Sequence, residues 1–235
     1  MKKRKEQSRA KGRAFWNREY ANASHLALST KPSEDLIAFL RWFEREHPDE
    51  LFGENATVLD VGCGNGRNLV YLADEYGVTG SGFDISREAI GQAQSDDLDF
   101  YVGSLADPLQ NEDESVDLVL DMMASHVLKK NERANLEDEI VRVLRPGGWL
   151  FMKTFLLDED RNAKRMLRDY PADEPGSYIH PAIGIVEHVY TEKELVSFLE
   201  PDFTIHRLTR SHQHLRGGKA FKRRSMCVYA QKKEV

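Results

Sequence analysis

One eleven-residue stretch limits the possible folds of this 235-residue chain more than any other feature. Residues 58–68 read Val-Leu-Asp-Val-Gly-Cys-Gly-Asn-Gly-Arg-Asn, a short strand pattern followed by three glycines at alternate positions. Glycine lets the backbone turn tightly, and it lets a bound molecule approach without a side chain in the way. The stretch therefore predicts a buried strand that ends at Asp60, a ligand-binding loop and then a helix.

Strand-like and helix-like segments alternate after this unit. Such alternation favours an α/β fold with a doubly wound, mostly parallel sheet. The strands are expected at residues 57–61, 80–84, 99–102, 116–121 and 149–155, and the helices between them at 68–75, 86–95 and 132–144. A Pro-Gly-Gly sequence at 146–148 is expected to separate the last helix from the last of these strands.

The chain around this alternation supplies further elements. An apolar helical face precedes the first strand, and an acidic and basic stretch rich in Pro and Tyr interrupts the pattern after the fifth strand. The expected elements are a helix at 32–46, a helix and long loop over 156–190, a helix at 191–199 that begins with a capping box of Thr191 and Glu194, and strands at 203–209 and 225–231 that pair as an antiparallel hairpin at the sheet edge.

Length and composition agree with a single soluble domain. Hydrophobic residues make up 40% and charged residues 31% of the chain, and no run approaches the roughly 20 apolar residues that a membrane helix needs. The basic N-terminus lacks the apolar run of a secretory signal, so a cytoplasmic location is expected. Cys63 and Cys227 are too few for a disulfide framework or a zinc site, and both are expected to be reduced.

Charge is distributed unevenly along the chain. The net charge is -6, but residues 1–13 and 216–235 each carry seven Lys or Arg residues against a single Glu. Each end is therefore +6 and the middle is -18. The basic ends either serve solubility or contact a polyanion such as RNA, and both interpretations stay open here.

The glycine loop and two acidic residues indicate the kind of ligand. A nicotinamide dinucleotide site needs Gly-x-Gly-x-x-Gly, but Arg67 stands where the third glycine belongs. Asp60 places a carboxylate beside the loop, which suits a ligand with an ammonium group better than a diphosphate. Asp84 closes the next predicted strand, where a carboxylate can accept hydrogen bonds from ribose hydroxyls. A nucleoside that also carries a cationic group is therefore predicted.

On these residues the sequence resembles the class I S-adenosylmethionine-dependent methyltransferases. Asp-Val-Gly-Cys-Gly-Asn-Gly at 60–66 is similar to the first motif of that family, and the resemblance, of the methyltransferase type 11/25 kind, covers about residues 57–155. A local similarity over 65–73 is to the tellurite-resistance and thiopurine type. The resemblance implies a Rossmann-like, seven-stranded sheet with an antiparallel last strand, S-adenosyl-L-methionine as cofactor and S-adenosyl-L-homocysteine as product. Further matching segments lie at 82–84, 102–104, 115–120 and 144–150.

The resemblance also implies a set of site residues. It places Asp60 and Gly62 at the methionine ammonium, Asp84 at the ribose, and Ser104 with Leu105 at the adenine. It also places Asp121 with Met122 at the sulfonium, where Met123 and Ala124 shape the site. Ser104 stands where the family often has Asp, although a hydroxyl can also accept the adenine amino hydrogen. The segment 1–31 is expected to form a basic lid ahead of the methyltransferase domain at 32–235. The complete expected cofactor-binding set is Trp16, Tyr20, Asp60, Gly62, Cys63, Gly64, Asn65, Gly66, Asn68, Asp84, Ile85, Ser104, Leu105, Asp121 and Met122.

Catalytic groups are expected in the segment 156–190, which would cap the substrate site. His188 and Glu187 are adjacent, and a neighbouring carboxylate can tune an imidazole for proton transfer near neutral pH. His180 completes the predicted catalytic set, and His126, Tyr178 and Tyr190 are further candidates. Asp-Met-Met-Ala at 121–124 replaces the Asn/Asp-Pro-Pro-Tyr/Phe motif of nucleobase amino-methylating enzymes, so that activity is disfavoured.

The acceptor of the methyl group is not defined by these motifs. A small molecule is favoured, because the segment 156–190 can cap a pocket and no separate recognition domain is present. An RNA or ribosome-associated substrate bound by the basic ends is the alternative, and a nicotinamide-dependent oxidoreductase is a weaker one. No metal is expected, since His212 and His214 lack a third ligand, and no membrane partner is expected. The oligomeric state is not predicted.

Overall fold

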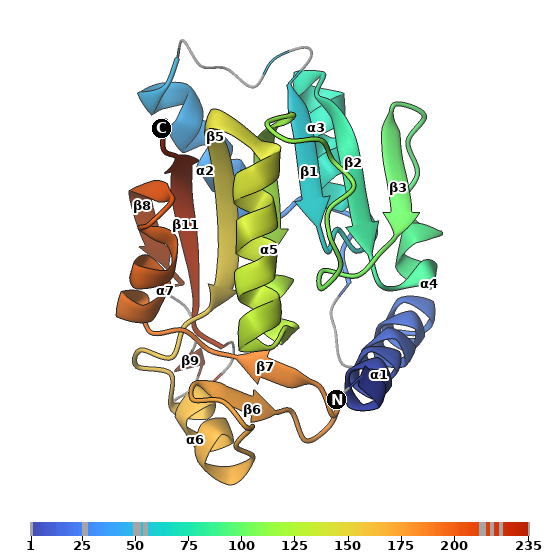
Figure 1. Ribbon diagram of the computed structural model, residues 1–235, viewed down its shortest axis with the longest axis vertical. Helices are drawn as coiled ribbons and strands as arrows, with labels where there is room; N and C mark the ends of the chain where they lie inside the picture. Colours follow the sequence, from blue (N-terminus) through green and yellow to red (C-terminus); the bar gives the residue numbers. More distant parts are fainter. Residues whose placement is uncertain are drawn as a thin grey trace.

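A seven-stranded sheet with helices on both faces forms the core of the protein in a computed structural model (Figure 1). The strand order is β3-β2-β1-β4-β5-β11-β8, and only β11 runs antiparallel to its neighbours. This confirms the doubly wound, mostly parallel sheet with an antiparallel last strand. The structure describes residues 2–24, 28–48, 53, 56–211, 215–216, 219–220 and 223–234.

The elements follow the predicted order along the chain. The strands of the main sheet are β1 (Thr57–Val61), β2 (Thr79–Asp84), β3 (Leu98–Val102), β4 (Val116–Met122), β5 (Leu144–Phe155), β8 (Phe203–Arg210) and β11 (Ser225–Lys232). The helices are α1 (Lys2–Ala21), α2 (Glu34–Glu46), α3 (Arg67–Tyr76), α4 (Arg87–Ile90), α5 (Lys130–Val143), α6 (Arg161–Asp169), α7 (Glu192–Leu199) and the short 3-10 helix η1 (Ser125–Val127). Two small hairpins pair β6 (Ser177–Ile179) with β7 (Val186–His188) and β9 (Leu215–Arg216) with β10 (Lys219–Ala220).

Apolar side chains fill a layer on each face of the sheet. Helices α5 and α7 pack on one face and helices α2 and α3 on the other. Successive strand residues point to opposite faces, so Leu59 joins the first layer and Val58 the second. Phe39 of α2 stacks on Phe151 of β5 with ring centroids 4.8 Å apart. No helix in the described ranges combines the length and the apolar character that crossing a membrane requires.

Helix α4 is shorter than predicted. The helix expected at 86–95 covers only Arg87–Ile90, because Gly91 follows it and the residues beyond are mostly exposed and polar. The cap predicted at Ser86 is present, since its Oγ accepts a hydrogen bond from the Ala89 N–H at 3.1 Å. The cap at Ser86 therefore starts the helix as predicted, but Gly91 and the polar residues after it end the helix early.

Strands β5 and β11 also differ in detail from the prediction. Strand β5 begins at Leu144 rather than at 149, because Leu144 already pairs with Val116 before a shift in register. The last two strands do pair antiparallel, but β11 lies between β5 and β8, so only β8 is the edge. Strand β11 is therefore hydrogen-bonded to a neighbour on each side, and β8 forms this edge of the sheet.

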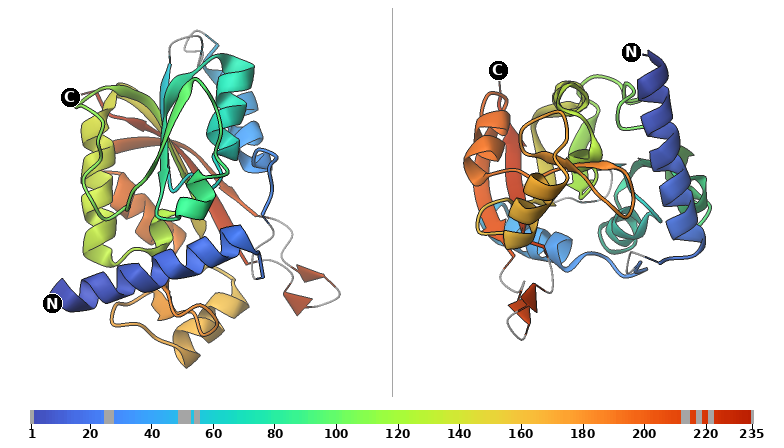
Figure 2. Two further views of the ribbon diagram at one scale, coloured as in Figure 1. Left: turned by 90° about the vertical axis from the view of Figure 1, so that its right-hand side faces the viewer. Right: turned by 90° about the horizontal axis from the view of Figure 1, so that it is seen from below.

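The carboxyl ends of the parallel strands meet at one edge of the sheet, where two further segments gather. Helix α1 crosses this edge in both views of Figure 2, and the β6–β7 hairpin with α6 lies below it in Figure 1. The strand order reverses between β1 and β4. Ligands of open α/β sheets bind at the carboxyl edge beside this reversal. The fold therefore places a candidate site between the strands, α1 and the hairpin.

Candidate active site

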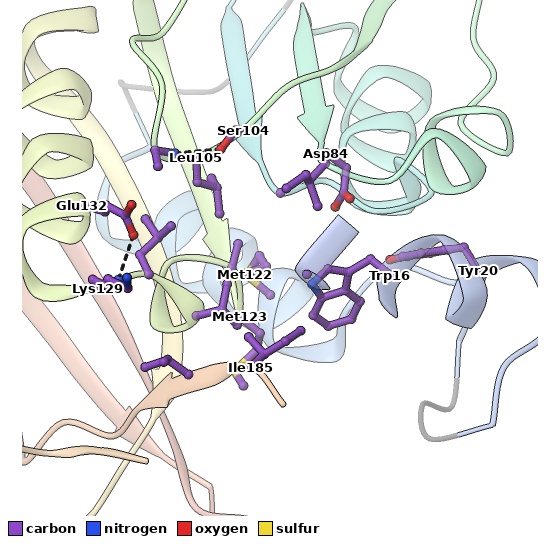
Figure 3. Close-up of a pocket in the computed structure, with 18 of the residues that line it drawn as sticks. Trp16, Tyr20, Asp84, Ser104, Leu105, Met122, Met123, Lys129, Glu132 and Ile185 are labelled. Carbon is purple, nitrogen blue, oxygen red and sulfur yellow. Dashed lines mark hydrogen bonds between the residues drawn. The ribbon is translucent and has the colours of Figure 1, made fainter. Parts of the chain in front are cut away.

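A pocket of about 360 Å³ occupies the carboxyl edge of the sheet (Figure 3). The loops after β1, β2 and β3 form one wall, and the turn after β4 with the start of α5 forms a second. Helix α1 contributes Trp16 and Tyr20, and the β6–β7 hairpin contributes Ile185 and Val186. Segments far apart in the sequence thus enclose one space.

The glycine loop after β1 makes its turn with a left-handed backbone. Gly62, Gly64 and Gly66 have φ values of 71°, 59° and 73°. A Cβ on Gly62 would lie 2.5 Å from the Cβ of Ala124, which is too close for two carbon atoms. The N–H groups of Gly62 and Cys63 both donate to the Phe83 carbonyl, at 2.9 and 3.0 Å. Glycine is therefore required here both for conformation and for space.

Asp60 lies in β1, two residues before the lining residue Gly62, and is buried without lining the pocket itself. The residue is 1% exposed, and its Oδ2 has no hydrogen-bond partner among the described residues. Burial, together with the carboxylates of Asp84 and Asp121, raises the pKa of Asp60 to about 8. An unpaired buried carboxylate next to a pocket favours a cationic donor as its partner. Asp60 therefore fits the ammonium group that the resemblance assigns to it.

Asp84 lies at the end of β2 in the wall of the pocket. Its two carboxylate oxygens accept hydrogen bonds from the backbone N–H groups of Gly64, at 3.1 Å, and Ser86, at 2.8 Å. These bonds fix the orientation of the carboxylate and leave lone pairs that can accept from hydroxyl groups. Burial nevertheless raises the pKa of Asp84 above its ordinary value. Ile85, Ser104 and Leu105, which the sequence also predicts as ligand contacts, line the same wall.

Helix α1 forms the outer wall of the pocket. Asn17 Oδ1 accepts from the Ser86 hydroxyl at 2.9 Å, and Gln92 Nε2 donates to the Tyr20 carbonyl at 2.8 Å. The Tyr20 hydroxyl stands over the glycine loop, since a Cβ on Gly64 would lie 2.1 Å from it. The segment predicted as a lid is thus tied to α4 by two side chains and faces the glycine loop.

Replacing Ser86 with alanine is expected to loosen α1 and to lower the free energy of unfolding by about 1 kcal/mol, the usual cost of a lost helix cap. The Ser86 hydroxyl is fully buried and joins the Ala89 N–H to Asn17. Hydrogen exchange of the amides at 12–20 should become several-fold faster in Ser86→Ala. The exposed Ser197→Ala in α7 is the control, and equal protection in the two variants would contradict this role for Ser86.

Several residues predicted to bind the cofactor face away from the pocket. Their polar groups are used within the protein: Asn65 Nδ2 donates to the Ser29 carbonyl, Asn68 Oδ1 accepts from the Ser33 N–H, and Asp121 Oδ1 accepts from the N–H groups of Ala124 and Ser125. Cys63 is buried, and its Sγ would lie 3.1 Å from a Cβ on Gly82. These side chains shape the segments that surround the pocket, while Met122 lines it directly as predicted.

The three predicted catalytic residues do not line the pocket. His188 is buried, with Nδ1 2.8 Å from the Ser177 hydroxyl and Nε2 3.1 Å from Glu194 Oε1. The Glu187 carboxylate accepts hydrogen bonds from the Tyr178 hydroxyl and from Arg223. His180 accepts from the Ala182 N–H within its own turn at 3.3 Å. The structure uses their polar groups inside the insert and gives no support to direct contact with an acceptor.

A buried ionic cluster holds the hairpin that carries Ile185 and Val186. The Arg223 guanidinium lies 3.7 Å from the centre of the Phe155 ring and donates to Glu187 at 2.8 Å. His126 packs edge-on against the same ring, and burial lowers its pKa to about 4. The remaining candidate Tyr190 is buried beside His188, with ring centroids 4.4 Å apart. This cluster joins the insert to the end of β5 and the start of β11.

The apolar wall was predicted in part. Met122, Met123 and Ala124 line the pocket, as the resemblance implies. Met123 has a φ of 66°, a conformation that few residues other than glycine adopt. Ile185 and Val186 were not predicted, because the candidates in the insert were titratable residues and these two carry hydrocarbon side chains. His212 and His214, considered above as metal ligands, lie outside the described residues.

Comparison with known proteins identifies relatives of this chain. A family model described as a methyltransferase domain matches residues 58–148. The phthiotriol/phenolphthiotriol dimycocerosates methyltransferase 1 of Mycobacterium ulcerans is 34% identical over 172 aligned residues, and the match covers 61% of this chain and 60% of that protein. This chain therefore spans less than two thirds of the length of that curated relative.

Two solved structures extend the comparison to the fold. An S-adenosylmethionine-dependent methyltransferase of Methanosarcina mazei matches with a TM-score of 0.66 and 28% identity, covering 80% of this chain and 97% of the other. The 1,6-didemethyltoxoflavin-N1-methyltransferase of Burkholderia thailandensis, solved with 1,6-didemethyltoxoflavin and S-adenosylhomocysteine, matches with a TM-score of 0.68 and 20% identity, covering 96% of this chain and 88% of the other. The second match concerns the fold alone.

Fold and sequence comparison agree on one class of protein, the α/β methyltransferases with an antiparallel last strand. Residues 58–148 match the methyltransferase domain, and the chain is similar in sequence and fold to class I S-adenosylmethionine-dependent methyltransferases. The resemblance drawn from the motif at 60–66 is thereby confirmed. The comparisons give no support to the nicotinamide-dependent oxidoreductase or to the RNA-directed alternative.

Proposed function

We propose that this chain transfers a methyl group from S-adenosylmethionine to a small apolar molecule. The observation that carries the proposal is the buried Asp60 carboxylate, whose Oδ2 has no partner in the described structure, behind a glycine loop that cannot accommodate a Cβ. Asp84 stands in the adjoining wall with its orientation fixed by two backbone N–H groups. A ligand with an ammonium at one end and a ribose beyond it satisfies both carboxylates.

The chain's own residues would bind and orient this ligand. Asp60 would pair with the ammonium group, Asp84 would accept from the ribose hydroxyls, and Ser104 with Leu105 would border the adenine. S-adenosylmethionine supplies a methyl group that is already activated by its bond to a positively charged sulfur. What remains for the protein is to align the acceptor in line with that bond and to exclude water, and Trp16 and Tyr20 of α1 close the pocket on the solvent side.

The acceptor side of the pocket supports a small-molecule substrate. The walls contributed by Met123, Ile185 and Val186 are apolar, and the last two bring the β6–β7 hairpin to the pocket. The named relatives act on phthiotriol-type dimycocerosates and on 1,6-didemethyltoxoflavin, which are small molecules. These observations favour the small-molecule acceptor over RNA.

Binding of S-adenosylhomocysteine tests the cofactor part of this proposal. We expect calorimetry to show specific binding, and Asp84→Asn to weaken it at least tenfold, since hydrogen bonds to a charged group contribute about 1.5–3 kcal/mol. Asp99→Asn, which removes an exposed charge from the neighbouring strand β3, is the control and should bind as the unaltered protein does. The absence of binding by a folded, unaltered protein would refute the proposal.

Transfer of a labelled methyl group tests the acceptor part. The protein would be incubated with methyl-tritiated S-adenosylmethionine and a cell extract, and the products separated into metabolites, RNA and protein before counting. We expect the label in the metabolite fraction and extractable into organic solvent. Label that ribonuclease releases would instead establish the RNA-directed alternative and remove the small-molecule proposal.

A further inference from the structure

We infer that the acceptor is an apolar acid of the phenol or thiol class, and that it reacts in its deprotonated form. This inference rests on the proposed function and specifies its substrate. It follows from the charges in the pocket wall, from the positions of the imidazoles and from the apolar surface between them.

The charged side chains in the described wall of the pocket are Arg67, Asp84, Lys129 and Glu132. Both oxygens of Asp84 accept from backbone N–H groups, and Glu132 Oε2 accepts from the Lys129 N–H at 3.2 Å. Arg67 donates to the Lys31 carbonyl at 3.0 Å, and the guanidinium of Arg67 and the ammonium of Lys129 offer only donors. The phenol of Tyr20 stays protonated, because burial and nearby carboxylates raise its pKa. Asp84 lies above Trp16 and Glu132 lies beside Lys129 in Figure 3, so both carboxylates stand apart from Met122, Met123 and Ile185.

Histidine, the residue that most often serves as a general base, lies outside the wall in the described part of the chain. His126 follows lining residue Ala124 closely, but its ring packs against Phe155, and burial lowers its pKa to about 4. His188 is buried between Ser177 and Glu194, and His180 accepts from its own turn. None of the imidazoles in the described part of the chain therefore lies beside the acceptor to take a proton from it.

The space where the acceptor would lie is bordered by hydrocarbon and thioether groups. Figure 3 shows Met122 and Met123 beside Trp16 and Ile185 below them, with Ser104 above all three. A charge that lacks a partner is costly in such surroundings. Methylation of a neutral amine creates a cation that would remain there unpaired, whereas methylation of an anion by a sulfonium removes both charges. The wall therefore favours an anionic acceptor paired with a cationic methyl donor.

The proposed step balances without a proton transfer. The lone pair of the phenolate oxygen or thiolate sulfur forms the new bond to the methyl carbon. The electron pair of the old sulfur–carbon bond returns to the donor sulfur, which becomes a neutral thioether. The acceptor loses its proton to water before it enters the pocket, and the products are a neutral ether or thioether and S-adenosylhomocysteine.

Binding of 4-nitrophenol tests this inference without turnover. Its ionised form absorbs visible light, so the state of the bound molecule can be read directly. We expect it to bind as the phenolate and at least tenfold more tightly with sinefungin, whose amine places a positive charge near the position of the sulfonium, than with neutral S-adenosylhomocysteine. Binding in the protonated form, or equal affinity in the two complexes, would overturn the inference.

A pair of variants in the hairpin supplies a matched control. Ile185 lines the pocket, whereas Ile179 of the same hairpin is 45% exposed and outside the wall. Ile185→Glu should weaken 4-nitrophenolate binding at least tenfold relative to Ile185→Gln, which has the same shape without the charge. S-adenosylhomocysteine affinity should be the same in both variants, and Ile179→Glu should bind the phenolate normally. Equal phenolate affinity in Ile185→Glu and Ile185→Gln would contradict an anionic acceptor at this wall.

Turnover with small aromatic probes completes the test. We expect methylation of thiophenol and 4-nitrophenol, little of aniline or benzyl alcohol, and a pH dependence whose inflection follows the pKa of each acceptor. An inflection that stays fixed across acceptors, a preference for aniline, or no transfer to thiophenol by a protein that binds S-adenosylhomocysteine would overturn the inference alone. Failure to bind S-adenosylhomocysteine would refute the proposed function instead.

Discussion

The affinity for S-adenosylhomocysteine is expected to rise about tenfold for each pH unit between about pH 6 and pH 8, the effect of one coupled proton. The proposed ammonium contact needs Asp60 in its ionised form, and the pKa of this carboxyl in the ligand-free protein is raised to about 8. Below that pH the carboxyl holds a proton that must leave when the ligand binds. Calorimetry at pH 7 in buffers of different protonation enthalpy should therefore show release of close to one proton.

Asp60→Asn should remove this pH dependence and weaken binding at pH 8 by about 10- to 100-fold, the value of a hydrogen bond to a charged group. Asn is neutral at every pH, so no proton is released on binding. Asp99→Asn is the control and should keep the pH dependence of the unaltered protein. If Asp60→Asn still released a proton on binding, the titrating group would have to be another carboxyl, such as Asp84 or Asp121.

The same residue should affect the stability of the ligand-free protein in the opposite direction. The pKa of Asp60 is about 8 in the folded protein against an ordinary value of 3.8 for an aspartate, so the folded state holds the proton more tightly. Its contribution is thus fully present below about pH 4 and is lost as the pH rises toward 8. Asp60→Asn should accordingly raise the melting temperature more at pH 8 than at pH 4. A variant that binds the cation less well but is more stable to unfolding is expected when the replaced residue serves function at a cost in stability.

The glycine loop and the sheet could be predicted because their signals are local. The strand pattern at 57–61 and the glycines after it are set by backbone conformation within a few residues. Alternating strands and helices then leave few topologies, and the two carboxylates at the ends of β1 and β2 fall at the edge where ligands bind. Asp84 and the adjoining Ile85 could therefore be placed in the pocket from the sequence alone.

The part of the apolar wall formed by Ile185 and Val186, and the role of the insert, could not be predicted in this way. Ile185 reaches the pocket because Glu187, two residues later, is held by Arg223, a contact between distant parts of the chain. No local pattern encodes that pairing. For the same reason, His188 and Glu187 looked available for chemistry, while the folded chain uses them to bury the insert. A sequence shows which residues can titrate. Whether such a residue can reach a substrate depends on the hydrogen bonds that its side chain makes within the folded protein.

Gly80→Ala is expected to cost about 4 kcal/mol or more, a large part of the 5–15 kcal/mol that holds an ordinary domain together. Gly80 has a φ of 144°, and a Cβ there would lie 1.9 Å from the backbone carbonyl oxygen of Val58. Both residues belong to paired strands in the centre of the sheet, and β2 ends with Asp84. The clash can be relieved only by separating β1 from β2, which would also displace the glycine loop from Asp84.

Urea unfolding followed by circular dichroism measures this effect. Gly80→Ala should unfold at a much lower urea concentration than the unaltered protein, and whatever remains folded should bind S-adenosylhomocysteine more weakly. Gly91→Ala is the control, since Gly91 has a helical φ of -63° and should tolerate the extra methyl group. Stability of Gly80→Ala equal to that of Gly91→Ala would mean that β1 and β2 pair in a different register. Because that register pairs Asp60 with Gly82, two residues before Asp84, the measurement tests the framework of the site as well as the fold.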